Sequence, residues 1–356
     1  MNFFSLFFLT VLVKIKSNWV ITPKKQIITG SIPTYEINLD LPVRERYEKI
    51  FLSSIDKIKK FVFEIKYSSK YIAFISQIGH VLIEESKQFL DPEWYEYIYT
   101  LSSVTNITLG EALMLSLGYD ISCTSIIVQT KNNEIIHGRN LDFDNHETIS
   151  DIAFIANYTK NGTFLYQDVE LIGFRGGLNG IKPNKFSLSI NLRYDNRRFQ
   201  NSYHILRSLA YPISGFHTPN YALMKVMTEA NSFEEAEKML SEIPLTSNAY
   251  FTLAGTKSNE GAIIARKQSF LVNITRLNVE NGKWYVGVCN KDVHNENITD
   301  YRLENAFSNI DIVTRDNINE DTLFKEVMWK YPNFNDITCY TAIMKGDSFN
   351  ITVWKK

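Results

Sequence analysis

The chain has 356 residues, 44% of them hydrophobic and 13% aromatic, which suffices for a large core of one or two domains. Its 38 basic and 39 acidic residues leave a net charge of −1, and no long run of one sign occurs. We therefore expect no nucleic-acid partner. The spacing of the His, Cys and carboxylate residues predicts no metal site and no cofactor.

The chain begins with an apolar run of 11 residues, from Phe3 to Val13. This run is too short to span a bilayer and is typical of a signal-peptide core. No Lys or Arg precedes it and the cleavage site near Ser17 is indistinct, so a buried N-terminal strand is the alternative. We expect residues 1–18 to be a signal peptide, which predicts a secretory route. Six Asn-x-Ser/Thr sequons agree with that route and are candidate glycosylation sites: Asn106, Asn157, Asn161, Asn273, Asn297 and Asn350.

Residues 40–120 have a helical pattern. Apolar side chains recur at helical spacing at Tyr71, Ile72, Phe74, Ile75, Ile78, Leu82 and Phe89. Thr108 and Glu111 form a capping-box pattern before an apolar run. Such a stripe usually packs in the core, and a membrane-touching or lipid-collecting face is the alternative.

From residue 123 the apolar period changes to two, which predicts strands. We expect strands at 124–129, 134–138, 152–158, 164–174 and 186–193. Helices should follow, one opened by Thr218 and Pro219 and one capped by Ser232. The remaining predicted elements are strands at 249–255, 261–266, 270–277 and 284–289, helices near 301–309 and 320–330, and strands at 339–344 and 349–354. Helices segregated between sheets predict an α+β protein, with two sheets sandwiched by helices.

The most informative run lies at the start of the strand region. Cys123-Thr124-Ser125-Ile126 is followed by the turn signal at 131–133 and by His137-Gly138-Arg139-Asn140-Leu141-Asp142. A two-residue loop at 131–132 would pair Cys123 with Asn140, and one at 132–133 would pair it with Asp142. A three-residue loop would pair it with Leu141. Each register returns residues 139–142 to the thiol. Arg139 and Asp142 should point to opposite faces of a regular strand, so we expect the strand to bend or end between them.

These groups favour a self-cleaving cysteine amidase. If the peptide bond between Ser122 and Cys123 were cut, Cys123 would carry both a thiol and an α-amine with a reference pKa of about 7.7–8. That amine can take the thiol proton and return it to a leaving amine, so no His is required. We expect His137 to be structural. Cys289 and Cys339 could pair, but each is expected to be an apolar strand residue.

Cys123-Thr124-Ser125-Ile126 with His137–Phe143 resembles the acid ceramidase and N-acylethanolamine acid amidase family of lysosomal N-terminal nucleophile hydrolases. Residues 32–42, 176–180 and 254–261 extend the resemblance over nearly the whole chain after residue 30. It implies a four-layer αββα sandwich with an added, mainly helical α-subunit at 19–122 and a catalytic β-subunit at 123–356. The two would form an α/β heterodimer after self-cleavage, in the lysosome or secreted.

The resemblance also implies roles for single residues. Cys123 would be the nucleophile, and Arg139 and Asp142 would position and polarise its thiol and amine. Asn290 would donate a hydrogen bond to the oxyanion, with Arg302 nearby. One departure is Leu192, which stands where the family places a Glu.

The implied reaction is hydrolysis of a lipid N-acyl amide through a Cys acyl-thioester. The short segment after Asp144 and the absence of a C-terminal cysteine pair favour N-acylethanolamines. Residues 38–42 and 186–189 look more like acid ceramidase, so ceramide is the alternative substrate. A non-catalytic secreted lipid-binding protein is an alternative of another class, which Leu192 permits. We also expect transient contact with a membrane or micelle, and an acyl channel lined partly by Phe74, Ile78 and Leu82 that ends at Cys123.

Overall fold

The computed structural model describes residues 32–68, 70–116, 122–193, 215–291, 300–348 and 351–355. The expected signal peptide and the sequons at Asn297 and Asn350 lie outside these ranges. Within them, no helix is both long enough and apolar enough to cross a membrane.

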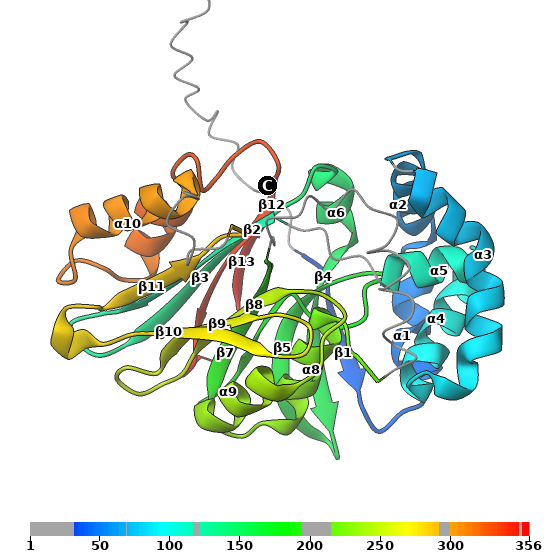
Figure 1. Cartoon of the computed structure of the whole chain (residues 1–356), viewed down its shortest axis with the longest axis horizontal. Coiled ribbons are helices and arrows are strands. Elements are labelled where there is room, and N and C mark those ends of the chain that lie inside the picture. Colours follow the sequence, from blue (N-terminus) through cyan, green and yellow to red (C-terminus); the bar gives the residue numbers. More distant parts are fainter. Residues whose placement is uncertain are drawn as a thin grey trace, which may run out of the picture.

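Two β-sheets lie face to face at the centre of the molecule (Figure 1). In the described part of the chain, the larger sheet has eight strands, in the spatial order β1 (Thr34–Asn38), β4 (Ala153–Lys160), β5 (Thr163–Leu171), β6 (Asn179–Lys182), β7 (Phe186–Leu192), β8 (Ala249–Ala254), β9 (Gly261–Arg266) and β10 (Leu271–Arg276). The smaller sheet has five, in the order β11 (Tyr285–Val288), β2 (Ser122–Gln129), β3 (Ile135–Asp142), β12 (Thr338–Lys345) and β13 (Thr352–Lys355). Every residue of β3 is buried, because helices and the other sheet cover its two faces.

Helices cover the outer face of each sheet, which confirms the predicted α+β sandwich. Helices α8 (Pro219–Glu229) and α9 (Phe233–Glu242) pack on the larger sheet. Their predicted starts are confirmed, since the side chains of Thr218 and Ser232 accept hydrogen bonds from the backbone of the first turn. The outer face of the smaller sheet is covered by α10 (Tyr301–Val313) and a π-helix, η3 (Leu323–Met328), which directly follows the single turn α11 (Glu320–Thr322).

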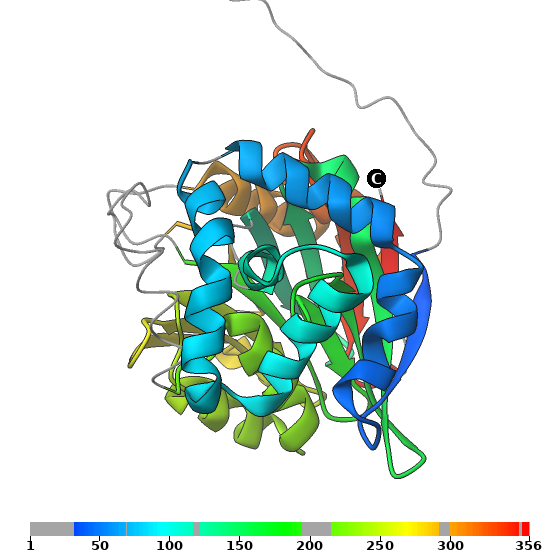
Figure 2. The ribbon, with the colours of Figure 1, turned by 90° about the vertical axis from the view of Figure 1, so that its right-hand side faces the viewer.

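The predicted helical region lies at one end of the sandwich (Figures 1 and 2). It contains α1 (Val43–Leu52), α2 (Ile55–Ser68), α3 (Lys70–Ser86), η1 (Lys87–Phe89), α4 (Pro92–Thr105) and α5 (Leu109–Ser116). The capping box is confirmed: the Glu111 carboxylate accepts from Thr108 N at 2.8 Å, and Thr108 Oγ1 accepts from Glu111 N at 3.2 Å. β1 pairs in parallel with β4 and so ties the start of this region to the larger sheet. The boundaries of separate subunits at 19–122 and 123–356 stay a prediction.

Some elements differ from those expected. The sequence did not predict α6 (His146–Ile152), the short strand β6 or the 3₁₀ turn η2 (Val279–Asn281). β3 runs four residues beyond the predicted end at 138, because its polar residues are buried and do not alternate with apolar ones as in a half-exposed strand.

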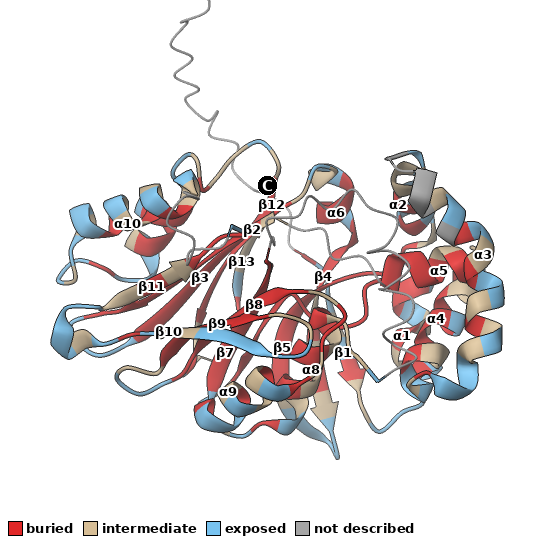
Figure 3. Ribbon diagram, in the orientation of Figure 1, coloured by how far each residue is buried: buried red, intermediate tan, exposed pale blue. Residues whose placement is uncertain are grey.

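The central strands and the helices at the end of the sandwich differ in how far their residues are buried (Figure 3). The central strands are buried along their length, whereas the helices α2 and α3 carry exposed large apolar side chains. Phe74 on α3 is 53% exposed, and Ile78 and Leu82 are half-buried. The expectation that Phe74 lines a buried acyl channel is therefore wrong, because a side chain so exposed lies on the outer surface of its helix.

Candidate active site

The β2–β3 hairpin sets the position of Cys123. Cys123 pairs with Leu141, and Thr130 N donates to Glu134 O at 2.9 Å. This is the register of a three-residue loop, one of the three left open by the sequence. Pairing continues one residue at a time to Ser122 opposite Asp142. The expected bend or end between Arg139 and Asp142 is therefore wrong: β3 stays regular and the two side chains leave its opposite faces.

The inner face of the hairpin, between the sheets, holds the thiol. Arg139 Nη2 donates to Cys123 Sγ at 2.9 Å, and both side chains are buried. Burial raises the pKa of the Cys123 thiol to about 11, although the Arg139 guanidinium lowers it. The thiol is therefore protonated at neutral pH, and a base would have to remove its proton before the sulfur could act as a nucleophile.

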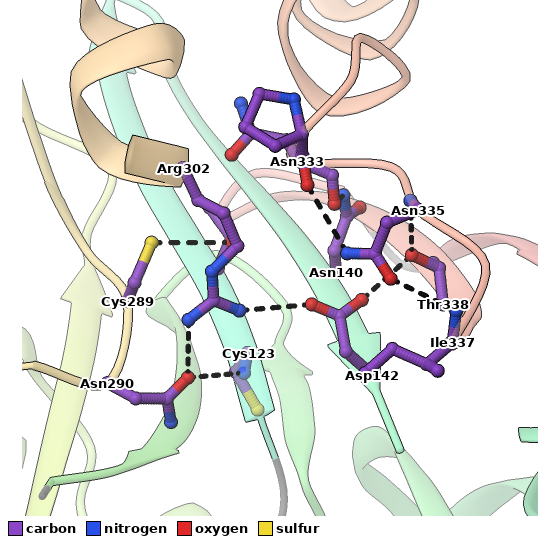
Figure 4. Close-up of polar contacts among 12 residues, drawn as sticks. Cys123, Asn140, Asp142, Cys289, Asn290, Arg302, Asn333, Asn335, Ile337 and Thr338 are labelled. Atoms are coloured by element: carbon purple, nitrogen blue, oxygen red, sulfur yellow. Dashed lines mark hydrogen bonds and ion pairs between the residues drawn. The ribbon is translucent and has the colours of Figure 1, made fainter. Parts of the chain in front are cut away.

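A second set of polar groups binds the backbone nitrogen of Cys123, at the start of β2 (Figure 4). Cys123 N donates to Asn290 Oδ1 at 2.8 Å, and the same oxygen accepts from Arg302 Nη2 at 2.8 Å. Arg302 Nη1 donates to Asp142 Oδ2 at 3.1 Å, and Thr338 Oγ1 donates to the other Asp142 oxygen at 2.8 Å. The structure thus brings together all five site residues predicted from the sequence. Arg139 contacts the sulfur of Cys123, Asn290 contacts its nitrogen, and Arg302 links Asn290 to Asp142.

The start of α10 positions the side chain of Arg302. Asp300 is the N-cap of this helix and also contacts the Arg302 guanidinium at 3.3 Å. Burial raises the pKa of the Asp142 carboxyl, and Arg302 and Thr338 oppose that shift. An ion pair supported by a hydroxyl donor therefore anchors the guanidinium beside Asn290.

The orientation of Asn290 is determined by its partners. Its Oδ1 faces two donors, and its Nδ2 donates to the carbonyl oxygen of Leu192 at 2.8 Å. Because a guanidinium only donates and a carbonyl only accepts, the amide has one consistent orientation. Asn290 Oδ1 faces the nitrogen of Cys123, and its amide group lies at the end of β7.

Asn191, another residue of this site, was missed at the sequence level. Asn191 Oδ1 accepts from Arg139 Nη1 at 2.9 Å and from Ser125 Oγ at 2.7 Å. The available signal was alternation, since Ser187, Ser189 and Asn191 are the polar residues of a strand whose other residues are all apolar. The same alternation turns Leu192 to the other face of β7, the side on which α8 packs. Although Leu192 stands where the family places a Glu, its side chain therefore does not disturb the polar contacts of Cys123.

The remaining predicted residues lie outside this cluster. Asn106, Asn161 and Asn273 are exposed, whereas Asn157 is half-buried in β4 and its Oδ1 accepts from Gln167 Nε2 at 2.8 Å. Cys289 and Cys339 are buried free thiols, so they are not bonded to each other. Within the described ranges, no group of three or more His, Cys, Asp or Glu side chains is placed to hold a metal ion.

Several known proteins are similar to this chain in sequence, and one solved structure is similar to it in fold. The chain is 28% identical to the N-acylethanolamine-hydrolyzing acid amidase of Caenorhabditis elegans over 340 residues, which cover 90% of this chain and 92% of that protein. It is 26% identical to the acid ceramidase of Homo sapiens over 341 residues, with 90% and 85% covered. A solved structure of the C. elegans N-acylethanolamine-hydrolyzing acid amidase ortholog matches with a TM-score of 0.60 at 28% identity, covering 66% of this chain and all of that one.

A family model also matches, and its match begins at the residue singled out by the sequence. Residues 123–310, more than half of the chain, match the linear amide C–N hydrolases of the choloylglycine hydrolase family. The protein is therefore an amidohydrolase that belongs to the choloylglycine hydrolase family of linear amide C–N hydrolases.

Proposed function

We propose that the protein is a self-cleaving cysteine amidase that hydrolyses lipid N-acyl amides, with N-acylethanolamines as its substrates. One observation carries the proposal: the sulfur and the nitrogen of the same residue, Cys123, are each held by their own buried polar groups, at 2.9 Å and 2.8 Å. A residue that is to act as both nucleophile and base needs this arrangement. The names of the relatives, N-acylethanolamine-hydrolyzing acid amidase and acid ceramidase, support the substrate class.

Self-cleavage would create the base. Cys123 Sγ attacks the carbonyl carbon of Ser122, and the thiol proton passes to the Cys123 nitrogen as the C–N bond breaks. Water then hydrolyses the resulting thioester, which frees the thiol and leaves a carboxylate on Ser122. Two observations support this step. The family match starts at residue 123, and residues 123–356 make up about the same share of the chain as the 66% covered by the solved relative.

The free α-amine then serves the reaction. An amide nitrogen cannot accept the thiol proton, but an amine with a reference pKa of about 7.7–8 can. The thiolate, stabilised by the charge of Arg139, attacks the amide carbonyl of the substrate. The amine returns the proton to the leaving amine, an acyl-thioester forms, and water releases the fatty acid. We assign the oxyanion contact to the Asn290 amide, a type of contact worth about 3–4 kcal/mol to the transition state.

Asp142 and Arg302 would act on the amine. Arg302 holds Asn290 Oδ1 beside the Cys123 nitrogen, and Asp142 holds Arg302. Oδ1 can accept from the amine, so it would turn the nitrogen lone pair toward the thiol proton. Their removal should lower turnover more than substrate affinity.

The segment before Cys123 would stay bound after cleavage. Tyr47 Oη of α1 lies 3.1 Å from Tyr158 Oη of β4, inside the core. Arg175, which follows β5, makes ion pairs with Asp91 and Glu93 at the start of α4. These contacts support an α/β heterodimer of residues 19–122 and 123–356. With residues 1–18 as a signal peptide, the mature enzyme would be lysosomal or secreted.

A patch of apolar side chains on α2 and α3 would contact the lipid surface. Its members are Phe63, Tyr67, Phe74 and Val81, which are 60%, 78%, 53% and 60% exposed. Beside them, a cleft of about 550 Å³ is lined by Val62, Ala73, Ile107, Lys59 and the ion pair of Lys66 with Glu111. Aromatic and cationic groups together suit a membrane or micelle with an anionic surface, and contact there would be transient.

Acid treatment of the purified protein tests the proposal. We expect two fragments on a denaturing gel, the larger one beginning Cys-Thr-Ser-Ile. Cys123→Ala should stay one chain and be inactive. Cys339→Ala, which removes another buried thiol, is the matched control and should be cut. A fully active protein that stays one chain would contradict the mechanism.

The substrate is decided by a parallel assay of N-acylethanolamines and a ceramide in anionic detergent at acidic pH. Faster hydrolysis of palmitoyl ethanolamide is expected. A strong preference for ceramide would make the protein a ceramidase, which is the second candidate. Lipid binding without hydrolysis of either substrate would favour the non-catalytic alternative.

A further inference from the structure

A chain of buried polar side chains lies between the two sheets and has no part in the mechanism above. His137 Nε2 lies 2.9 Å from Ser189 Oγ, Ser189 Oγ lies 3.0 Å from Ser125 Oγ, and Ser125 Oγ lies 2.7 Å from Asn191 Oδ1. All four side chains are fully buried. Buried hydroxyl and imidazole groups are costly unless each donor meets an acceptor, so the direction of every hydrogen bond can be worked out.

Asn191 fixes one end of the chain. Its Nδ2 lies 3.2 Å and 3.1 Å from the carbonyl oxygens of Val288 and Cys289. Carbonyl oxygens only accept, so the amide nitrogen must face them, and Oδ1 is the atom turned toward Ser125. Ser125 therefore donates its proton to Asn191 Oδ1.

The other directions follow because a hydroxyl has a single proton. Ser125 has given its proton to Asn191, so Ser189 donates to Ser125. Ser189 then can only accept from His137, which must carry its proton on Nε2. The other ring nitrogen, Nδ1, accepts from Ser187 Oγ at 3.1 Å. Burial, and then the charge of Arg139, lower the pKa of His137 to about 3, so the ring is neutral in mild acid.

The direction of these hydrogen bonds determines how the Arg139 guanidinium is held. Its Nη1 donates to Ser125 Oγ at 3.2 Å and to Asn191 Oδ1 at 2.9 Å, which leaves Nη2 directed at Cys123 Sγ. If the chain ran the other way, Ser125 would donate to Ser189, and Ser125 Oγ and Asn191 Oδ1 would face each other at 2.7 Å with no proton between them. The two oxygens that accept from Nη1 would then repel each other and move apart. The guanidinium is planar and rigid, so a fixed Nη1 also fixes Nη2.

We propose that His137 and Ser189 are positioning residues: as the start of a one-way hydrogen-bond chain, they orient the Ser125 and Asn191 acceptors that hold Arg139 against the Cys123 thiol. The inference rests on the proposed role of Cys123 as the nucleophile. It gives a function to His137, which the chemistry of an N-terminal nucleophile does not otherwise use.

The tautomer of His137 is the first test, and it needs no substrate. Nitrogen-15 NMR of the cleaved protein at pH 5 should show one neutral imidazole protonated on Nε2. The signal is assigned by its loss in His137→Asn or, if that variant does not fold, by its shift in Ser187→Ala. A ring protonated on Nδ1, or a charged ring, overturns the proposal.

Two serines of β7 give a matched pair for the second test. Ser189→Ala and Ser187→Ala each remove one partner of the same imidazole, from the same face of the same strand. Only Ser189→Ala cuts the chain to Arg139. The rate at which iodoacetamide alkylates Cys123, followed by mass spectrometry against pH, reports on the thiol directly.

Ser189→Ala should slow this alkylation and lower kcat by about tenfold or more, because small displacements of a catalytic group are costly. KM should stay nearly unchanged, and Ser187→Ala should remain close to wild type in both measurements. Equal effects of the two variants overturn the proposal, since they would reflect only lost packing. If the protein hydrolyses no lipid amide, the proposed function fails, whereas the NMR and alkylation results still decide the role of the chain.

Discussion

Arg139 and Asp142 lie three residues apart on β3, and their side chains serve opposite sides of the same cysteine. Arg139 contacts the Cys123 sulfur at 2.9 Å, on the face between the sheets. Asp142 lies on the other face, where Arg302 and Asn290 connect it to the Cys123 nitrogen. A regular strand thus separates the side chain that contacts the Cys123 sulfur from the one that is linked to its nitrogen.

Asp142→Asn should lower kcat more than it changes KM. The substitution keeps the shape but removes the charge that anchors Arg302, so the Cys123 amine would lose its orientation. It should also destabilise the fold by about 2 kcal/mol, since it removes one of the two carboxylates that pair with a largely buried guanidinium and leaves only Asp300. Steady-state kinetics and urea unfolding measure the two effects.

Asp300→Asn is the control for this variant. Asp300 also contacts Arg302, but it is a helix N-cap, and Asn is an equally good cap. Asp300→Asn should lower kcat less than Asp142→Asn does. A larger fall in Asp300→Asn than in Asp142→Asn would contradict the assignment of Asp142.

Stability should fall as the pH rises from about 4.5 to 7, because of two carboxyl groups on β5. Asp168 and Glu170 are fully buried and lie two residues apart on the same face of β5. Two carboxylates so close together and so buried cannot both ionise at low cost, so we expect them to hold a proton between them near neutral pH. Burial raises the pKa of Glu170 to about 7, although Tyr158, Asp168 and Arg175 oppose the shift, and burial and the Glu170 charge raise the pKa of Asp168. A carboxyl whose folded pKa is raised stabilises the fold below its unfolded pKa, and this contribution is lost as the pH passes the folded pKa.

Glu170→Gln should remove this contribution, which is on the order of 2–3 kcal/mol. Urea unfolding at pH 4.5, 5.5 and 7 measures this contribution as the difference in unfolding free energy between wild type and variant at each pH. Glu45→Gln, an exposed position on α1, should keep the pH dependence of the wild type. If the free energy of unfolding changes with pH equally in Glu170→Gln and in wild type, the pair of carboxyl groups does not titrate in this range.

The apolar patch on α2 and α3 should govern access to lipid. Tyr67→Ser and Phe74→Ser should each raise KM by about tenfold for an amide presented in anionic vesicles, because each removes apolar area that a lipid surface would bury. A short, soluble amide should be hydrolysed as before. Ile312→Ser on α10 removes a side chain that is 76% exposed elsewhere and is the control. If it has the same effect as the other two, the patch is not the lipid contact.

Leu192→Glu should destabilise the protein without improving catalysis. The Leu192 side chain is 2% exposed and lies on the face of β7 opposite Asn191, so a carboxylate there would be buried among apolar groups. The loss should be on the order of 3 kcal/mol in urea unfolding. Leu192→Met, which conserves volume, should cost far less. A Glu variant as stable as wild type and faster in acid would instead place position 192 in the site.

The sequence by itself determined the parts of this protein that depend on neighbours along the chain. The apolar period of two, the turn at 131–133 and the caps at Thr218 and Ser232 were sufficient to predict the hairpin and the helix starts. The hairpin also predicted that Arg139 returns to Cys123, because only a short loop separates them. The family motif added Asn290 and Arg302, which lie far from Cys123 in sequence.

Only the tertiary structure decided which of three registers the hairpin adopts and which face each side chain takes. Packing against the second sheet selects the register, since a shift of one residue would exchange the buried polar side chains of the two faces. The same packing brings Asn191 and Ser189 of β7 to Arg139 and turns Leu192 away. Burial decided the rest: it raises the pKa of the Cys123 thiol, keeps His137 neutral and leaves Phe74 on the surface, because each of these depends on groups that are distant along the chain.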